Sequence, residues 1–313
     1  MQDYRRLRAE HGFLDLCKNP KLAAEITITP VETLKVDAAI LFADILLLLE
    51  PMGVGLEYSK GDGPVIHRPV RSAADVDRLK DIDAGKNLSF VFETVRECRR
   101  ALSEKVPLIG FSGAPFTLAS YLIEGGGSRN YISTKSFFYK EPEAWRTLMT
   151  KLAIATAEYL NGQIAAGAQA VQIFDSWAGC LAPGDYERFV LPYTRAVIEA
   201  VKPGVPVIHF STGTSGFLKQ IRAAGADAIG VDWRVNLDEA WAAIGHDLAI
   251  QGNLDPVALF APPEQIRNRV REILDRAAGR CGHIFNLGHG ILPETPVENV
   301  IAMVEAVHEL SGK

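Results

Sequence analysis

The chain lacks the cysteine pattern of a structural zinc site or a disulfide scaffold. Its four cysteines, Cys17, Cys98, Cys180 and Cys281, lie far apart in 313 residues, and none belongs to a CxxC pair. Clustered or regularly spaced cysteines are what such frameworks require. We therefore expect reduced thiols and a reducing compartment.

Long apolar runs and basic clusters are also scarce. The longest apolar run, 38–49, has 12 residues and contains Asp44, whereas a membrane span needs about 20 apolar residues. The first residues lack the apolar core of a signal peptide, so we expect a cytoplasmic protein. The net charge is −5 and no basic block stands out, which argues against nucleic acid and membrane partners.

Short apolar stretches alternate with longer amphipathic ones, which is typical of repeated βα units. The predicted helices include 143–166, 183–201, 215–223 and 263–277. The predicted strands are 38–45, 107–111, 170–174, 206–210, 228–231, 248–251 and 283–287. This alternation predicts an α/β fold, a (β/α)8 barrel of the TIM type, as a single domain over residues 1–313.

A closed barrel of this type needs one strand more than the seven predicted here. Residues 3–16 and 20–33 look helical and precede the first predicted strand, so we expect the first barrel strand to be missing from this chain. The alternative is an overlooked edge strand within 53–69, a glycine-rich stretch that looks more like a hairpin insertion.

Barrel active sites form where the strands end at their carboxyl side. Polar residues follow each predicted strand there, namely Asp44, Ser112, Asp175, Ser176, Ser211, Thr212, Asp232, Asn253, Asp255 and His289. His289 stands between two glycines, which let a backbone approach a ligand closely. The alternative role for His289 is a hydrogen-bonded loop anchor.

Seven segments, in order along the chain, closely resemble the uroporphyrinogen decarboxylase family. They are 42–46 (FADIL), 110–118 (GFSGAPFTL), Tyr121 with 124–127 (EGGG), 174–179 (FDSWAG), 230–234 (GVDWR), 251–256 (QGNLDP) and 286–290 (NLGHG). The resemblance implies removal of the four acetate carboxyl groups of uroporphyrinogen III to give coproporphyrinogen III, in heme and related tetrapyrrole synthesis. It also implies a homodimer and no metal or organic cofactor.

The resemblance assigns roles to particular residues. Asp44 matches the carboxylate that accepts hydrogen bonds from the pyrrole NH groups, and Tyr121 matches a phenol near it; these two are our candidate catalytic residues. Ser176, His289 and Arg8 match residues that contact or border the substrate. Judged from the residues alone, each of these side chains has an ordinary structural alternative. Asp44 could cap a helix at the end of its strand, and Tyr121 could be a half-buried helix aromatic. Ser176 could be a turn serine or a helix cap, and Arg8 could be a solvated arginine.

The chain departs from the family at its beginning. Members open with a strand ending in an Arg-Gln-Ala-Gly-Arg-Tyr run, and this sequence starts just after the corresponding point. Two arginines expected to bind substrate carboxylates are therefore absent, one of them a candidate proton donor. We expect Met1 to be an internal methionine of a longer natural protein.

Two other functions remain open. Cobamide-dependent methyltransferases bind zinc through a His-x-Cys pair, but this chain has His209-Phe210-Ser211 at the matching strand, without the thiolate that zinc thiol activation calls for. The second alternative is an inactive or weakly active barrel that binds porphyrin or porphyrinogen without decarboxylating it.

Overall fold

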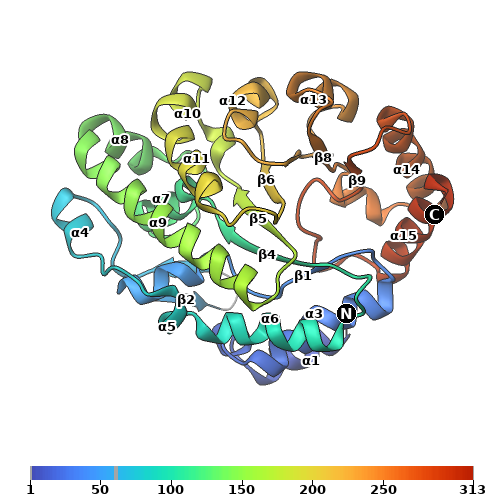
Figure 1. Ribbon diagram of the computed structural model, residues 1–313, viewed down its shortest axis with the longest axis horizontal. Helices are drawn as coiled ribbons and strands as arrows, with labels where there is room; N and C mark the ends of the chain where they lie inside the picture. The colour runs from blue at the N-terminus through green and yellow to red at the C-terminus, as the bar shows by residue number, and fades with distance from the viewer. Residues whose placement is uncertain (1, 60–62, 313) are drawn as a thin grey trace.

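A computed structural model describes residues 2–59 and 63–312, and a curled parallel sheet lies at its centre (Figure 1). The seven-stranded sheet has the order β1-β4-β5-β6-β7-β8-β9, and all its neighbouring strands are parallel. Its strands are β1 (Ala39–Ile40), β4 (Leu108–Gly113), β5 (Ala170–Asp175), β6 (Val207–Ser211), β7 (Ala228–Gly230), β8 (Ala249–Gln251) and β9 (His283–Ile284). All seven predicted strands are confirmed.

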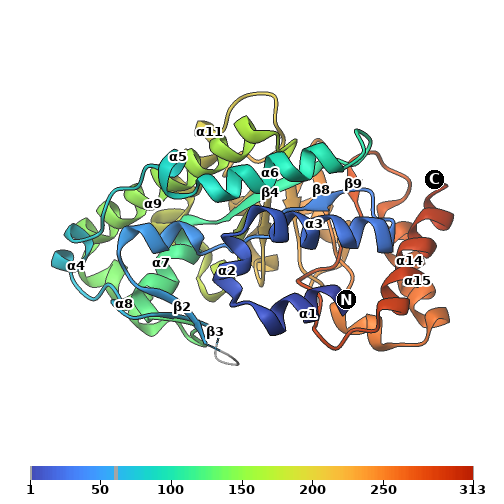
Figure 2. The same ribbon diagram turned by 90° about the horizontal axis from the view of Figure 1, so that it is seen from below.

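Helices surround the convex side of this sheet, as the βα alternation predicts (Figure 1). The described helices are α1 (Gln2–Glu10), α2 (Phe13–Cys17), α3 (Pro20–Leu34), α4 (Ala73–Asp77), α5 (Ala84–Asn87), α6 (Ser89–Ala101), α7 (Pro115–Glu124), α8 (Ile132–Lys140), α9 (Pro142–Ala166), α10 (Pro183–Phe189), α11 (Leu191–Ala200), α12 (Leu218–Arg222), α13 (Leu237–Ile244), α14 (Pro263–Ala277) and α15 (Val297–Ser311). Of these, α1 and α2 lie on the side of the β2–β3 hairpin (Figure 2). The helix predicted over 183–201 is divided at Val190, where Pro192 in the first turn of α11 has no N–H to continue α10.

The first strand is much shorter than its sequence suggests. We predicted 38–45, but only Ala39 and Ile40 pair with β4. Beyond them, the buried hydroxyl of Thr27 in α3 accepts a hydrogen bond from the Phe42 N–H at 2.9 Å. The chain then turns into the buried 3-10 helix η1 (Leu47–Met52). The apolar run therefore supplies one short strand and one core helix.

The sheet is open between β1 and β9, its two edge strands, and the described residues place no strand between them. The helical layer nevertheless continues past this edge, because α15 packs against α3. The Arg5 guanidinium also donates to the Pro293 carbonyl at 2.9 Å, and His308 lies 3.3 Å from Asp37. The fold is therefore a TIM-type barrel with seven of its strands in place.

The hairpin predicted within 53–69 is confirmed. β2 (Leu56–Ser59) and β3 (Gly63–Ile66) are antiparallel and form a separate two-stranded sheet. Residues 60–62 lie outside the described part of the chain. The alternative of a barrel strand in this region is wrong, because the hairpin lies below the barrel sheet beside α2 (Figure 2).

The four cysteines differ in accessibility, which predicts the order of their chemical modification. Cys17 and Cys98 are buried, and burial raises their pKa values to about 12 and about 11. Cys180 is partly buried, with a pKa raised by burial to about 11, whereas Cys281 is exposed. At pH 8 a thiol with a pKa of about 11 is thiolate in about one molecule in a thousand. We expect one fast thiol in native protein, measured with a chromogenic disulfide reagent.

The matched control is Cys281→Ser, which should lose the fast phase while total thiol in denaturant falls by one. A fast phase that persists in this variant would contradict the assignment to Cys281.

Within the described residues, no helix combines the length and the apolar character needed to cross a membrane.

Candidate active site

Four of the five predicted site residues come from regions that follow strands, at the carboxyl end of the sheet. Asp44 follows β1, Tyr121 lies in α7 directly after β4, Ser176 follows β5 and His289 follows β9. Arg8 lies in α1. In a parallel sheet these strand ends share one edge, which is where α/β barrels bind their ligands.

The concave face of the sheet carries aromatic and amide side chains. The rings of Phe111, Phe174 and Phe210, from β4, β5 and β6, touch in series with centroids 5.4 and 5.7 Å apart. The Gln251 side-chain amide donates across the sheet to the side-chain oxygen Oε1 of Gln172 at 3.2 Å. Since β5 and β8 are not neighbours, this bond identifies their shared side as the barrel interior.

Asp44 is held by hydrogen bonds to one of its two carboxylate oxygens. The Leu46 N–H donates to Oδ1 at 2.7 Å, and the Tyr58 hydroxyl donates to the same oxygen through a short hydrogen bond. The described residues donate no hydrogen bond to Oδ2. Burial raises the pKa of Asp44, while the bonds from Tyr58 and Leu46 oppose that rise. This is the setting of a carboxylate prepared for a further partner.

Tyr58 is the functional residue that the sequence analysis missed. It lies in β2, on a hairpin outside the barrel sheet, and its ring packs against Phe13 of α2 with centroids 4.8 Å apart. We predicted that a phenol would lie near Asp44 and assigned it to Tyr121. Tyr121 lies near Asp44 as expected, and Tyr58 is a second phenol, the one whose hydroxyl binds the carboxylate. Alternation in the hairpin could have shown that Tyr58 faces inward, but nothing in the sequence places the hairpin over Asp44.

Tyr121 is buried close to Asp44 without a hydrogen bond between them. Burial, together with the negative charge of Asp44, raises the pKa of Tyr121 to about 12. Its ring meets Trp177, the residue after Ser176, edge to face at 5.9 Å between centroids. Tyr121 therefore connects the Asp44 side of the site to the loop after β5.

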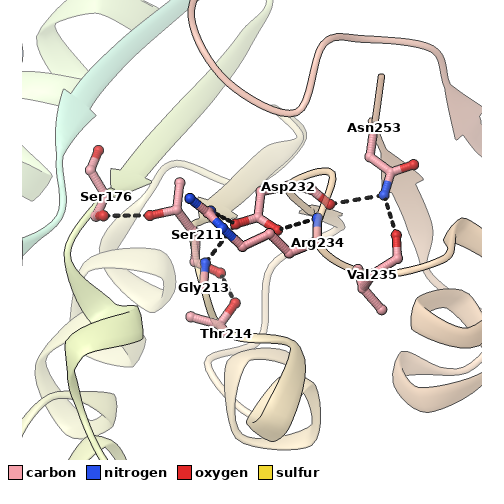
Figure 3. Close-up of polar contacts among 9 residues, drawn as sticks. Ser176, Ser211, Gly213, Thr214, Asp232, Arg234, Val235 and Asn253 are labelled. Atoms are coloured by element: carbon pink, nitrogen blue, oxygen red, sulfur yellow. Dashed lines mark hydrogen bonds and ion pairs between the residues drawn. The ribbon is translucent and has the colours of Figure 1, made fainter. Parts of the chain in front are cut away.

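Ser176 borders a hydrogen-bonded frame that joins the loops after β5, β6, β7 and β8 (Figure 3). Its carbonyl accepts from the Thr212 hydroxyl. The carboxylate of Asp232 accepts from the Gly213 N–H at 2.7 Å and from the backbone and side chain of Arg234. The Asn253 amide donates to the Asp232 carbonyl at 2.8 Å. The frame fixes the strand-end loops and leaves the Ser176 hydroxyl outside its bonds.

His289 is exposed beside the aromatic face. Its ring lies 6.5 Å from that of Phe210 and 6.3 Å from that of Trp233. The two flanking glycines differ: a Cβ on Gly288 would lie 2.6 Å from the Trp233 backbone nitrogen, whereas one on Gly290 would meet open space. Gly288 is therefore needed for close backbone packing that places His289, rather than for access of a ligand.

Arg8 borders the hairpin side of the site. Its guanidinium lies 5.7 Å from the centre of the Phe13 ring and donates to the His11 carbonyl at 2.8 Å. Arg8, Phe13 and Tyr58 help to line a pocket of about 270 Å³. A larger hollow of about 730 Å³, near Val207 and Asp227, opens at the amino ends of β6 and β7. It therefore lies at the opposite side of the sheet from the site residues.

His209 points away from the barrel interior. It alternates with Phe210 along β6, so its side chain faces the helices, where it is fully buried 3.8 Å from Asp175. Across residues 2–59 and 63–312, no three His, Cys, Asp or Glu side chains are grouped to hold a metal ion.

Fold and site together define an α/β-barrel enzyme with a strand-end carboxylate and an aromatic concave face. The profile of the family described as uroporphyrinogen decarboxylase matches residues 1–310. A uroporphyrinogen decarboxylase from Carboxydothermus hydrogenoformans is 57% identical over 313 residues, covering 100% of this chain and 89% of the relative. One from Solibacter usitatus is 56% identical over 310 residues, covering 99% and 90%. The chain belongs to the uroporphyrinogen decarboxylase family, which confirms the predicted resemblance.

Solved structures show the same fold in more distant proteins. A methyltransferase from Methanosarcina mazei superposes with a TM-score of 0.77 at 21% identity, covering 95% of this chain and 90% of that one. A B12-independent methionine synthase from a Shewanella species gives a TM-score of 0.62 at 12% identity, covering 92% and 86%. At these identities the likeness concerns the fold alone, and family membership favours the decarboxylase over the methyltransferase alternative.

Proposed function

We propose that this protein decarboxylates the four acetate side chains of uroporphyrinogen III to give coproporphyrinogen III, in tetrapyrrole and heme biosynthesis. Membership of the family supports the reaction. The observation that carries it at the site is Asp44, a partly buried strand-end carboxylate whose Oδ2 receives no hydrogen bond from the described residues. Pyrrole N–H donors from the centre of the substrate would satisfy it.

The chemistry explains why a carboxylate is useful and a cofactor is not required. Protonation of a pyrrole carbon makes a cationic ring, which accepts the electron pair released when the acetate carboxyl leaves as CO₂. A second proton then bonds to the side-chain carbon in place of the carboxyl group, and the first proton leaves the ring carbon, which restores the pyrrole. Asp44 would stabilise the transient cation, because a fixed negative charge in a site of low polarity interacts strongly with developing positive charge.

Substrate carboxylates would be met at the rim of the site. We propose that Ser176, His289 and Arg8 bind or border them, with Tyr121 beside Asp44 as the second catalytic candidate. A local cation matters here because the protein carries a net charge of −5, and an anionic ligand binds best where charged donors face it.

The test is anaerobic incubation of purified protein with uroporphyrinogen III, followed by oxidation and chromatography that separates porphyrins by their number of carboxyl groups. The proposal expects products with seven to four carboxyl groups to appear over time. Binding without any loss of carboxyl groups would contradict it and support a porphyrinogen-binding protein instead. Equal turnover after exhaustive chelation is expected, since no step requires a metal.

We also propose a homodimer, on the strength of the family resemblance, and a cytoplasmic location, on the strength of the scattered cysteines that suit a reducing compartment. Light scattering coupled to size-exclusion chromatography tests the assembly. The proposal expects a mass near twice the chain mass of 34.1 kDa, and a monomer at micromolar concentration would contradict it.

A further inference from the structure

We infer that Tyr58 is a positioning residue that binds one oxygen of Asp44 and thereby presents the other, Oδ2, to the substrate. The inference rests on the proposed function and deepens it, because it names the carboxylate oxygen that accepts the pyrrole N–H groups. It concerns a side chain from the β2–β3 hairpin, an element that carries none of the predicted site residues.

The bonding pattern at Asp44 divides its two oxygens by role. Oδ1 accepts from the Leu46 N–H at 2.7 Å and from the Tyr58 hydroxyl, while described residues leave Oδ2 without a donor. Two donors on one oxygen fix both the position and the rotation of the carboxylate. A macrocycle that brings N–H donors would meet the other oxygen without first breaking a bond within the protein.

Tyr58 is itself held in place from two sides. Its backbone belongs to the hairpin, where Tyr58 pairs with Pro64 in register. Its ring packs against Phe13 at 4.8 Å between centroids, and the Arg8 guanidinium lies on the same Phe13 ring. The phenol therefore has a fixed place between the barrel and α2, as a hydrogen bond that orients a catalytic group requires.

The groups around Asp44 leave few other sources of stabilisation for its charge. Tyr121 of α7, Tyr159 of α9 and Cys17 of α2 face it, and burial raises the pKa of each, so all three are neutral at pH 7. The nearby cations Arg8 and Lys18 act on Cys17, whereas the pKa of Asp44 is lowered only by hydrogen bonds from Tyr58 and Leu46. The hydrogen bonds from Tyr58 and Leu46 are then what favours the ionised form against burial.

The direction of the pH effect follows from this. Tyr58 lowers the pKa of Asp44, so its removal raises that pKa further above the ordinary value. The ionised form of Asp44 then becomes the major form only at higher pH. Hydrogen bonds to charged groups correspond to a shift of about one to two pH units. The acidic limb of kcat/KM should therefore move upward by about that amount.

The experiment compares Tyr58→Phe with Tyr139→Phe in the full chain. Tyr139 of α8 donates to the Asp185 carboxylate at 2.7 Å on the surface, so the control removes the same kind of bond away from the site. Tyr58→Phe is expected to shift the acidic limb and to lower kcat more than it raises KM, and Tyr139→Phe should do neither. An unshifted limb, or a lower KM with unchanged kcat, would overturn the inference.

A second measurement separates this inference from the decarboxylase assignment. Tyr58→Phe, Asp44→Ala and the double variant are compared in urea unfolding at pH 7. If the two side chains bind each other, the losses in the free energy of unfolding should be non-additive. Residues in contact show such coupling in a double-variant cycle, whereas the effects of independent residues add up. Additive losses would overturn the pairing whether or not the protein turns over. Coupling without turnover in the wild type would instead reject the proposed function alone.

Discussion

Replacing Asp44 by alanine is expected to lower kcat at least about 10³-fold, because losing a preorganised charge or donor at a reacting centre costs about that much. The fold should survive. Asp44 is only partly buried and accepts two hydrogen bonds, so the loss in the free energy of unfolding should be about 1–2 kcal/mol. Porphyrinogen turnover and urea unfolding check the two expectations. Asp44→Asn, which keeps the shape without the charge, should be similarly inactive.

The matched control for Asp44 is Asp255→Ala. Both aspartates follow a barrel strand, and each side chain accepts the N–H two residues further on, Leu46 for Asp44 and Val257 for Asp255. If Asp44 served only to accept this backbone hydrogen bond, the two variants would retain similar turnover. We expect Asp255→Ala to retain most turnover at a comparable cost in stability. Substantial turnover in Asp44→Ala would show that Asp44 is merely a strand-end cap.

Gly288→Ala should produce the second large effect. A Cβ there would lie 2.6 Å from the Trp233 nitrogen and 3.1 Å from the Asp232 carbonyl carbon, both backbone atoms. Backbone must therefore shift, and overpacking of this kind lowers the free energy of unfolding by about 1–3 kcal/mol. Since His289 is the next residue and a shift of about 1 Å can cost ~10²-fold in rate, kcat/KM should fall at least about tenfold.

Gly290→Ala provides the comparison within the same loop. A Cβ at Gly290 would meet nothing within 4 Å, so turnover and stability should stay close to wild type. Thermal unfolding and kcat/KM, measured for both variants, compare their stability and turnover. Equal effects at the two glycines would mean that close packing of Gly288 does not place His289.

The strands and the candidate aspartate could be predicted from the sequence because their signals are local. Each barrel strand is a short apolar stretch between turn residues, and its register follows from the parallel βα repeat. Asp44 stands out as a charge within the apolar run 38–49. The hairpin was likewise visible from the glycines and short apolar pieces around it.

Other features depended on neighbours that are distant in the chain. β1 ends early because Thr27, 15 residues before Phe42, binds its backbone. Gly288 matters because the backbone of Trp233 approaches it. His209 faces the helices rather than the interior, and only the position of Phe210 among the other aromatic rings shows this. These contacts join residues of different helices, strands and loops, so no local sequence pattern can reveal them.

The sequence by itself determined the α/β barrel class, the family and the identity of the strand-end carboxylate, since periodicity and short motifs are properties of neighbouring residues. Only the tertiary structure decided which phenol binds that carboxylate. Tyr58 reaches Asp44 across 14 residues, and it does so because the hairpin folds beside α2 and under the open end of the barrel. A hydrogen bond depends on the distance between two atoms in space, and that distance exists only once the separate elements have packed together.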